Sequence, residues 1–211
     1  MLRSLFISFE GIDGSGKSTQ AKRLSSALRH LGYDVVDVRE PGGTPLGEDI
    51  RSMLLDTEHA VSSKAELLLF SAARSQLVDT VIEPALKSGS VVIADRFADS
   101  STAYQGGGRS LGGQRWFDRF NNFVVSGREP DRTYLIDITP QQALARRQGE
   151  PDDRIEQEGA AFYERVREAY LQLHAIRPRR IVRLDGMAPA EALHADILKD
   201  TLAILRGTEA A

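Results

Sequence analysis

Short apolar runs alternate along the chain with longer segments in which apolar residues recur at helical spacing. The apolar, β-branched runs predict five strands, at 5–9, 34–39, 90–95, 133–138 and 181–184. The helical spacing predicts helices near 17–31, 46–55, 64–88, 113–126, 140–147, 160–176 and 189–205. Strands that are apolar throughout and alternate with helices indicate a parallel sheet covered on both faces. The expected fold class is therefore α/β, a doubly wound, parallel, five-stranded sheet.

Glycine and proline mark the boundaries of these elements. Gly32 and Gly89 stand where helix C-caps are expected. Pro84 is expected to bend or interrupt the long third helix, because proline cannot donate the hydrogen bond made inside a helix. The chain shows no repeats, low-complexity tracts or linkers, so we expect residues 1–211 to form one domain.

The polar, charged and glycine-rich residues cluster directly after the predicted strands. They occupy 10–18, 39–43, 95–97 and 139–140. Ligands of open α/β sheets collect at the carboxyl ends of the strands. These four segments are therefore expected to form the rim of a single cleft.

The first of these segments contains a complete G-x-x-x-x-G-K-S phosphate loop. It reads Gly11-Ile12-Asp13-Gly14-Ser15-Gly16-Lys17-Ser18, after a strand and before a helix. Its backbone N–H groups and the helix N-terminus can bind phosphate, Lys17 can bridge the β- and γ-phosphates, and Ser18 can ligate Mg²⁺. A glycine-rich turn that merely precedes a helix is disfavoured, because strand, motif and helix are in register. The motif predicts binding of a nucleoside triphosphate.

Two further strand ends carry candidate residues. Asp95 ends an apolar strand where phosphate-loop enzymes place a carboxylate that reaches Mg²⁺ or its waters, and Arg96 can bind a second phosphate bidentately. The alternative is an Asp that caps a turn. Arg39-Glu40-Pro41-Gly42-Gly43 predicts a tight turn that a ligand can approach closely. A plain β-turn remains equally compatible with that segment.

The most charged segment, 145–156, joins two predicted helices. It is either an exposed charged loop or a lid that closes over the triphosphate and brings in arginines. Because the phosphate loop carries Ser15 between Gly14 and Gly16, an arginine that stabilises the transition state must come from elsewhere.

Phe70 and Arg74 lie one helical turn apart and share a face, which suits a nucleobase. Taken alone, Phe70 fits an ordinary core position better. Residues 100–109 are rich in hydroxyl and amide groups before three glycines, which taken alone favours a flexible surface loop.

Composition narrows the possible functions. The net charge of −3 argues against nucleic acid as the main partner. The chain has no cysteine, which excludes disulfides, thiolate metal sites and cysteine nucleophiles, and its four histidines lack metal-ligand spacing. It has no apolar run long enough for a membrane span and no recognisable secretory signal. We therefore expect no membrane partner and a cytoplasmic location.

Together these motifs resemble the thymidylate kinase family, in its bacterial form with lid arginines. The matching segments are 9–19, the Arg39–Gly43 turn, Phe70 with Arg74, Asp95-Arg96, 103–109 and 153–158, in the family's order and covering about 5–175. The phosphate loop is common to a large superfamily, whereas the glycine turn and the Tyr104-Gln105-Gly106 segment are specific. The resemblance implies a nucleoside-monophosphate-kinase-like fold with a mobile lid, roughly 146–158, and homodimers.

The resemblance also implies roles for individual residues. ATP would bind to Gly11, Ile12, Asp13, Gly14, Ser15, Gly16, Lys17, Ser18 and Thr19. Phe70 would stack on thymine, Arg74, Gln105 and Ser101 would hydrogen-bond its edge, and Tyr104 would lie under the sugar and favour deoxyribose. Arg96, helped by Arg39, would hold the acceptor phosphate. Asp13 and Glu40 would help position Mg²⁺ and the phosphates, and Ser18 and Asp95 would ligate the Mg²⁺ directly or through water. Lys17, Asp13, Arg96, Asp95 and a lid arginine (Arg146, Arg147 or Arg154) would be catalytic. Phe97 and Ser101-Thr102 depart from several relatives, which weakens the role of Ser101.

The reaction implied is transfer of the γ-phosphate of Mg·ATP to dTMP, giving dTDP and ADP. The acceptor oxygen is already an anion, so no general base is required. The nearest alternative is a deoxynucleoside kinase, in which a carboxylate such as Asp95 would accept the proton of a neutral 5′-hydroxyl. A GTP-dependent switch protein would need an Asn-Lys-x-Asp segment, but neither Asn121 nor Asn122 precedes a lysine. A nucleotide-binding module without chemistry is disfavoured by the lid-like arginine segment.

Overall fold

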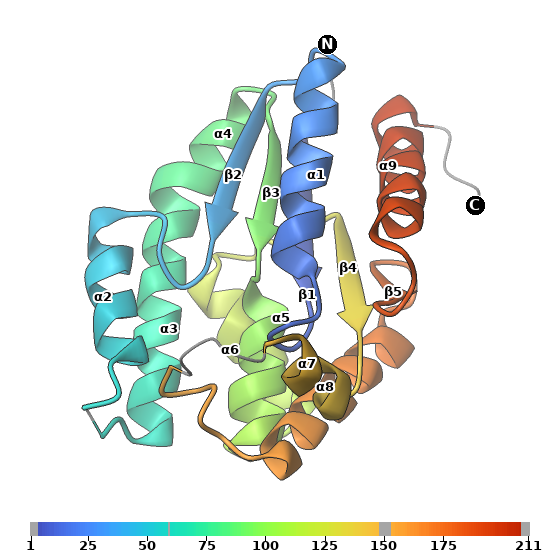
Figure 1. Ribbon diagram of the computed structural model, residues 1–211. Helices are drawn as coiled ribbons and strands as arrows, with labels where there is room; N and C mark the ends of the chain where they lie inside the picture. Colours follow the sequence, from blue (N-terminus) through green and yellow to red (C-terminus); the bar gives the residue numbers. More distant parts are fainter. Residues whose placement is uncertain (1–3, 59, 148–152, 208–211) are drawn as a thin grey trace.

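The computed structural model describes residues 4–58, 60–147 and 153–207, and it shows one sheet with helices on both faces (Figure 1). The strands are β1 (Leu5–Glu10), β2 (Val35–Arg39), β3 (Val91–Asp95), β4 (Arg132–Asp137) and β5 (Ile181–Asp185). Their order across the sheet is β2-β3-β1-β4-β5, and every pairing is parallel. The expected fold class and all five strands are confirmed.

The helices are α1 (Lys17–His30), α2 (Pro45–Leu55), α3 (Ser63–Leu77), α4 (Glu83–Lys87), α5 (Ala98–Ser101), α6 (Gln114–Val124), α7 (Pro140–Arg146), α8 (Ala160–Ile176) and α9 (Ala190–Arg206), with π-helical segments η1 (Val78–Ile82) and η2 (Thr102–Gly108). Local sequence explains where several of them begin. The Thr44 hydroxyl caps α2, and Thr139 with Gln142 forms a capping box that starts α7 directly after β4. No helix in the described part of the chain has the length and apolar character needed to cross a membrane.

The glycine and proline boundaries are confirmed. Gly32 (φ +86°) and Gly89 (φ +91°) follow helices α1 and α4 in the left-handed conformation that glycine adopts without strain. The long helix predicted at 64–88 is interrupted, as expected near Pro84: it is divided into α3, η1 and α4, and Pro84 occupies the first turn of α4. The helical backbone continues from η1 into α4, and the Glu83 N–H still bonds the Val78 carbonyl; the wider π-helical turn of η1 lies directly before the proline, which has no N–H to donate.

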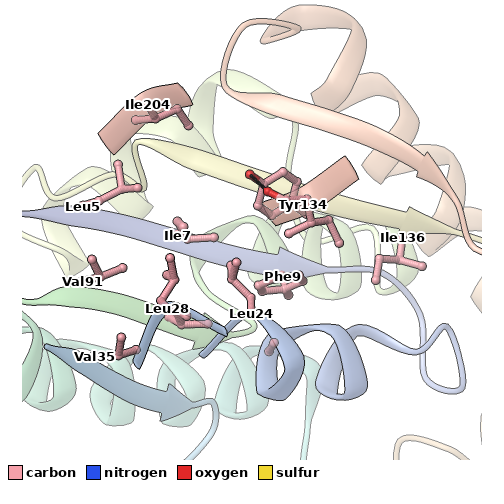
Figure 2. Close-up of a cluster of buried hydrophobic side chains, with 13 residues drawn as sticks. Leu5, Ile7, Phe9, Leu24, Leu28, Val35, Val91, Tyr134, Ile136 and Ile204 are labelled. Carbon is pink, nitrogen blue, oxygen red and sulfur yellow. Dashed lines mark hydrogen bonds between the residues drawn. The ribbon is translucent and has the colours of Figure 1, made fainter. Parts of the chain in front are cut away.

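Alternate residues of β1 face opposite layers of the molecule. Leu5, Ile7 and Phe9 pack against α1 and α9 in a continuous cluster (Figure 2) that includes Leu24 and Ile204. On the opposite face, the cluster around Phe6 contains residues of α3, η1, α4 and α6. A further cluster joins Leu135 of β4 to residues of α8. Burial of each large side chain stabilises the fold by about 1.5–3 kcal/mol. The sheet is thus covered by helices on both faces, and the loops that carry the candidate residues follow the carboxyl ends of its strands.

The expectation of a flexible surface loop at 100–109 is wrong. Most of this segment lies in α5 and η2, and Ser101, Ala103 and Gln105 are buried. Its glycines serve close packing against α8: a Cβ placed on Gly107 would lie 2.6 Å from the Cβ of Ala169. Three adjacent glycines are typical of a flexible loop, but here the absence of their side chains lets η2 and α8 approach each other closely.

Candidate active site

A cavity of about 340 Å³ lies over the carboxyl ends of β1, β2 and β3. Of the candidate residues it brings together Asp13, Lys17, Ser18, Arg39, Glu40, Phe70, Arg74, Asp95, Arg96, Ser101, Tyr104 and Gln105. Lys22, Pro41, Arg51, Leu55, Ser100, Asp153 and Ile155 complete its lining. The three candidate lid arginines do not line it. The rim expected from the strand ends therefore forms a single site, except at 139–140, which does not line the cavity.

The phosphate loop has the geometry of an anion site. Gly11, Gly14 and Gly16 all have positive φ, between +81° and +140°. Gly16 is the N-cap of α1 and provides no side chain to bond the free N–H groups of the first turn. These N–H groups and the helix dipole remain available for a phosphate.

Asp13 joins two cations at the floor of the cavity. Its carboxylate accepts hydrogen bonds from Lys17 Nζ at 3.1 Å and from Arg96 Nη2 at 2.6 Å. Burial alone would raise the pKa of Asp13, but the charges of Arg96 and Lys17 hold it well below its ordinary value. Burial also lowers the pKa of Lys17. The three side chains form a compact group with net positive charge, which suits the phosphates of a nucleotide.

Arg96 is held firmly in place by groups of the phosphate loop and of η2. Its guanidinium donates to the Gly11 carbonyl at 2.9 Å and to the Tyr104 hydroxyl at 2.9 Å, and it lies 4.9 Å from the centre of the Tyr104 ring. Its backbone φ of +74° is in the left-handed region, which costs a non-glycine residue about 1–2 kcal/mol. Strain maintained in this way is typical of a functional position.

Arg74 and Glu40 form a buried ion pair among the residues that line the cavity. The pair is 2.6 Å long, and its side chains are 1% and 3% exposed. Arg74 also donates to the Ser101 hydroxyl at 2.7 Å and to the Phe97 carbonyl at 3.2 Å. This network fixes the guanidinium next to Phe70, which is partly exposed and lines the cavity. A flat apolar ring beside fixed polar groups suits a base. Glu40, which was expected to help position Mg²⁺ and the phosphates, lines the cavity and is paired with Arg74.

The structure separates the three candidate lid arginines. Arg146 donates to the Ser15 carbonyl at 3.2 Å, and the stem of Arg147 lies against Gly14, with Arg147 also paired to Glu156 at 2.7 Å. Arg154 instead donates to the Leu54 carbonyl and to Glu66, away from the phosphate loop. The centre of the expected lid, 148–152, lies outside the described residues.

Arg51 is a cavity residue that the sequence did not reveal. It lies on α2 and donates to the Pro41 carbonyl at 3.0 Å, and burial lowers the pKa of its guanidinium. An arginine on an amphipathic helix normally faces solvent, so the position of Arg51 in the sequence did not indicate that its side chain lines a cavity. Glu66, on α3, was missed for the same reason.

The residues present fit a magnesium ion held jointly with phosphate oxygens. Asp95 Oδ1 is buried and has no hydrogen-bond partner within the described structure, and Ser18 lines the same cavity. No group of three or more acidic or histidine side chains gathers to hold a metal alone in the described part of the chain. Mg²⁺ commonly takes one or two protein ligands plus substrate phosphates and water, which matches this arrangement.

Glu10, at the end of β1, makes stability depend on pH. It accepts hydrogen bonds from Ser100 Oγ and Tyr170 Oη at 2.6 and 2.7 Å, and burial followed by the charge of Asp99 raises its pKa to about 7. Between pH 5 and 8 the folded protein binds a proton that the unfolded chain has lost, so stability falls as pH rises. We expect wild type to lose roughly 2 kcal/mol more than Glu10→Gln over this range, measured by urea unfolding. Parallel pH dependences of the two proteins would contradict this assignment.

The chain is similar to known proteins along almost its whole length. The family model for thymidylate kinase matches residues 9–197. A thymidylate kinase of Caldanaerobacter subterraneus subsp. tengcongensis is 46% identical over 99% of this chain and 100% of its own length, and one of Halothermothrix orenii is 47% identical over 93% and 95%. The crystal structure of thymidylate kinase from Ehrlichia chaffeensis superposes with a TM-score of 0.79 at 33% identity, covering 93% of this chain and 98% of that one. With a match of this extent in sequence and in fold, the chain belongs to the thymidylate kinase family.

Proposed function

We propose that this chain transfers the γ-phosphate of ATP to the phosphate of dTMP, giving dTDP and ADP. The observation that carries the proposal is the arrangement of one cavity. Among the residues that line it, Asp13 joins Lys17 of the phosphate loop to Arg96, and Phe70 lines the same cavity with the Arg74 network. Two phosphate groups and one base can therefore occupy it together. The acidic, cysteine-free chain is proposed to work in the cytoplasm, where both nucleotides occur.

At the donor end, the backbone N–H groups of residues 11–19 and the Lys17 ammonium would cradle the phosphates of ATP. Ser18 and Asp95 would hold Mg²⁺, directly or through water, and the ion would neutralise charge on the phosphate oxygens. Asp13 keeps Lys17 and Arg96 at fixed positions, so two cations are in place before the reaction starts. Such preorganised charge is usually the largest contribution to catalysis of phosphoryl transfer.

At the acceptor end, Arg96, with Arg39 at the rim, would bind the phosphate of dTMP. Phe70 would stack on thymine, while Arg74, Ser101 and Gln105 would face its polar edge. Tyr104 donates through its hydroxyl to Asp13 at 3.0 Å, which fixes its ring. The ring would lie under the sugar, where a ribose 2′-hydroxyl would have to fit. This contact would favour deoxyribose over ribose.

The acceptor phosphate is itself the nucleophile and needs no proton removed. This point separates dTMP kinase activity from the alternative, a deoxynucleoside kinase with Asp95 as general base. An ADP-release assay with dTMP, dUMP, dCMP, dAMP, dGMP, UMP and thymidine tests the choice. We expect turnover with dTMP and none with thymidine in the wild type, and Asp95→Asn should keep this preference for dTMP even where its rate is lower. Turnover of thymidine but not dTMP would refute the proposal.

Among the lid arginines, Arg146 is proposed to contribute most to turnover, because it already contacts the carbonyls of the phosphate loop. Arg146→Ala should lower kcat by about 10²-fold with a modest change in the KM for ATP. Arg147→Ala and Arg154→Ala, assayed in parallel, rank the three positions. Unchanged turnover in all three variants would contradict a catalytic lid.

A homodimer is proposed from the exposed apolar residues of adjoining helices. Leu68 on α3 is 60% exposed, while Trp116 and Phe123 on α6 are 48% and 82% exposed, and the two helices contact each other. Large exposed apolar side chains gathered in this way mark interaction surfaces. Light scattering should give twice the 23.2 kDa chain mass, and Phe123→Asp should shift it toward one chain mass. A monomeric wild type would refute this assignment.

A further inference from the structure

Glu66 is a buried carboxylate on α3 that sits one helical turn before Phe70 and two before Arg74. Its side chain is 1% exposed and accepts four hydrogen bonds. Oε1 accepts from Gln105 Nε2 at 3.0 Å and from Arg109 Nε at 3.2 Å. Oε2 accepts from Arg109 Nη2 at 3.0 Å and from Arg154 Nη2 at 2.7 Å. One carboxylate therefore joins Gln105, which lines the cavity, to Arg109 at the end of η2 and to Arg154 within the expected lid.

The two arginines keep Glu66 ionised and immobile. Burial alone would raise the pKa of Glu66, but hydrogen bonds from Arg109, Gln105 and Arg154 bring it below its ordinary value. An ionised carboxylate only accepts hydrogen bonds. The amide of Gln105 must therefore turn its nitrogen toward Glu66, and its remaining polar atom is the acceptor Oε1.

That orientation decides which base edge the pocket accepts. Thymine presents an N3–H donor, which an amide oxygen pairs with, whereas cytosine presents an unprotonated N3 acceptor, which it does not. We propose that Glu66 is a positioning residue that determines specificity for thymine over cytosine by holding Gln105 with its acceptor toward the base. This inference rests on the proposed function, since it assigns the base that the same cavity selects.

In the Glu66→Gln variant we expect the side-chain amide of Gln105 to take the opposite orientation, with its NH₂ group toward the base. Two guanidinium nitrogens, Arg109 Nη2 and Arg154 Nη2, donate to Oε2 at 3.0 and 2.7 Å, whereas one, Arg109 Nε, donates to Oε1 at the longer distance of 3.2 Å. The new amide should therefore place its oxygen at the position of Oε2, and Arg109 Nε loses its acceptor. The NH₂ group of the new amide then occupies the place of Oε1 and faces Gln105. To pair with this donor, Gln105 has to flip, and its own NH₂ group becomes the atom offered to the base. The flipped amide would leave the N3–H of thymine unpaired and would suit the N3 of cytosine.

The test measures kcat/KM for dTMP and for dCMP in wild type, Glu66→Gln, Gln105→Ala and the double variant. In Glu66→Gln the dTMP-to-dCMP ratio should fall about 10- to 100-fold, the usual cost of one unpaired buried hydrogen-bonding group. On the Gln105→Ala background, Glu66→Gln should leave the ratio unchanged, because its effect acts through that amide. Glu66→Asp, which keeps the carboxylate, should retain the wild-type ratio even if its kcat/KM is lower.

Asp137→Asn is the matched control. Asp137 is likewise a buried carboxylate held by two arginines, Arg167 and Arg183, but it does not line the cavity. Its variant should lose stability without a change in the dTMP-to-dCMP ratio. Equal losses with dTMP and dCMP in Glu66→Gln would overturn the proposal, as would the same shift in ratio with and without Gln105.

A second measurement uses the wild-type protein and does not depend on the folding of any Glu66 variant. The side-chain amide protons of Gln105, identified in the NMR spectrum by their absence in Gln105→Ala, should be protected from solvent exchange before any nucleotide is added. Rapid exchange would overturn the proposal. Because this readout needs no turnover, it stays interpretable if wild type fails to phosphorylate dTMP, a result that would refute the proposed function instead.

Discussion

Replacement of Arg96 by alanine is expected to lower kcat/KM for dTMP by about 10³-fold, the size of effect seen when a charge clamp on a transferred phosphoryl group is lost. The guanidinium is fixed by Gly11, Asp13 and Tyr104, so no neighbouring side chain can move into its place at low cost. Steady-state assays at varied dTMP and saturating ATP measure the loss. The fall should include kcat, because the positive charge acts on the reacting phosphates and not only on substrate binding.

Arg96→Lys provides the matched control for this result. Lysine keeps the charge but cannot reproduce the planar fork that bonds two partners at once, so it should recover only part of the loss. Thermal unfolding separates a folding defect from a catalytic one. A kcat/KM within about fivefold of wild type in Arg96→Ala would show that this arginine does not hold the acceptor.

Replacement of Arg74 by methionine is expected to lower the free energy of unfolding by about 3–5 kcal/mol, the usual cost of leaving one member of a buried ion pair without its partner. Glu40 would be the stranded charge, since its side chain is 3% exposed and its ion pair is with Arg74. Burial already raises the pKa of Glu40 even with that partner present. Urea unfolding at pH 7 measures the loss.

The double variant Arg74→Met/Glu40→Leu separates stability from recognition. Two apolar side chains of similar volume should restore most of the stability, because no buried charge remains. They should not restore the KM for dTMP, because the donors proposed to face the base are gone. A stable Arg74→Met single variant, or a double variant with a wild-type KM, would contradict the role of this pair.

The parts of the site that the sequence predicted are those in which neighbours along the chain determine the geometry. The glycines at 11, 14 and 16 force the turn, and the strand before and the helix after them orient it, so phosphate binding follows from one continuous segment. Asp95 and Arg96 could be placed because a parallel sheet brings its carboxyl ends to one edge.

The parts that could not be predicted depend on contacts between distant segments. Arg51 and Glu66 look like ordinary polar residues of amphipathic helices until the turn at Pro41 and the arginines at 109 and 154 fold against them. Residues 100–109 look like a loop because glycine lowers helix propensity, yet most of them lie in α5 and η2, where Gly107 and Gly108 pack closely against α8. The roles of Phe70 and Gln105 came from the family resemblance, because spacing alone left both open.

A crystal structure of the protein with dTMP and a non-hydrolysable ATP analogue tests the central claim most directly. The account predicts thymine against Phe70 and next to Arg74, the dTMP phosphate on Arg96, and the γ-phosphate of the analogue at Lys17, facing the acceptor across Asp13. A pyrimidine bound anywhere other than beside Phe70 and Arg74, or an acceptor phosphate that does not touch Arg96, would contradict it.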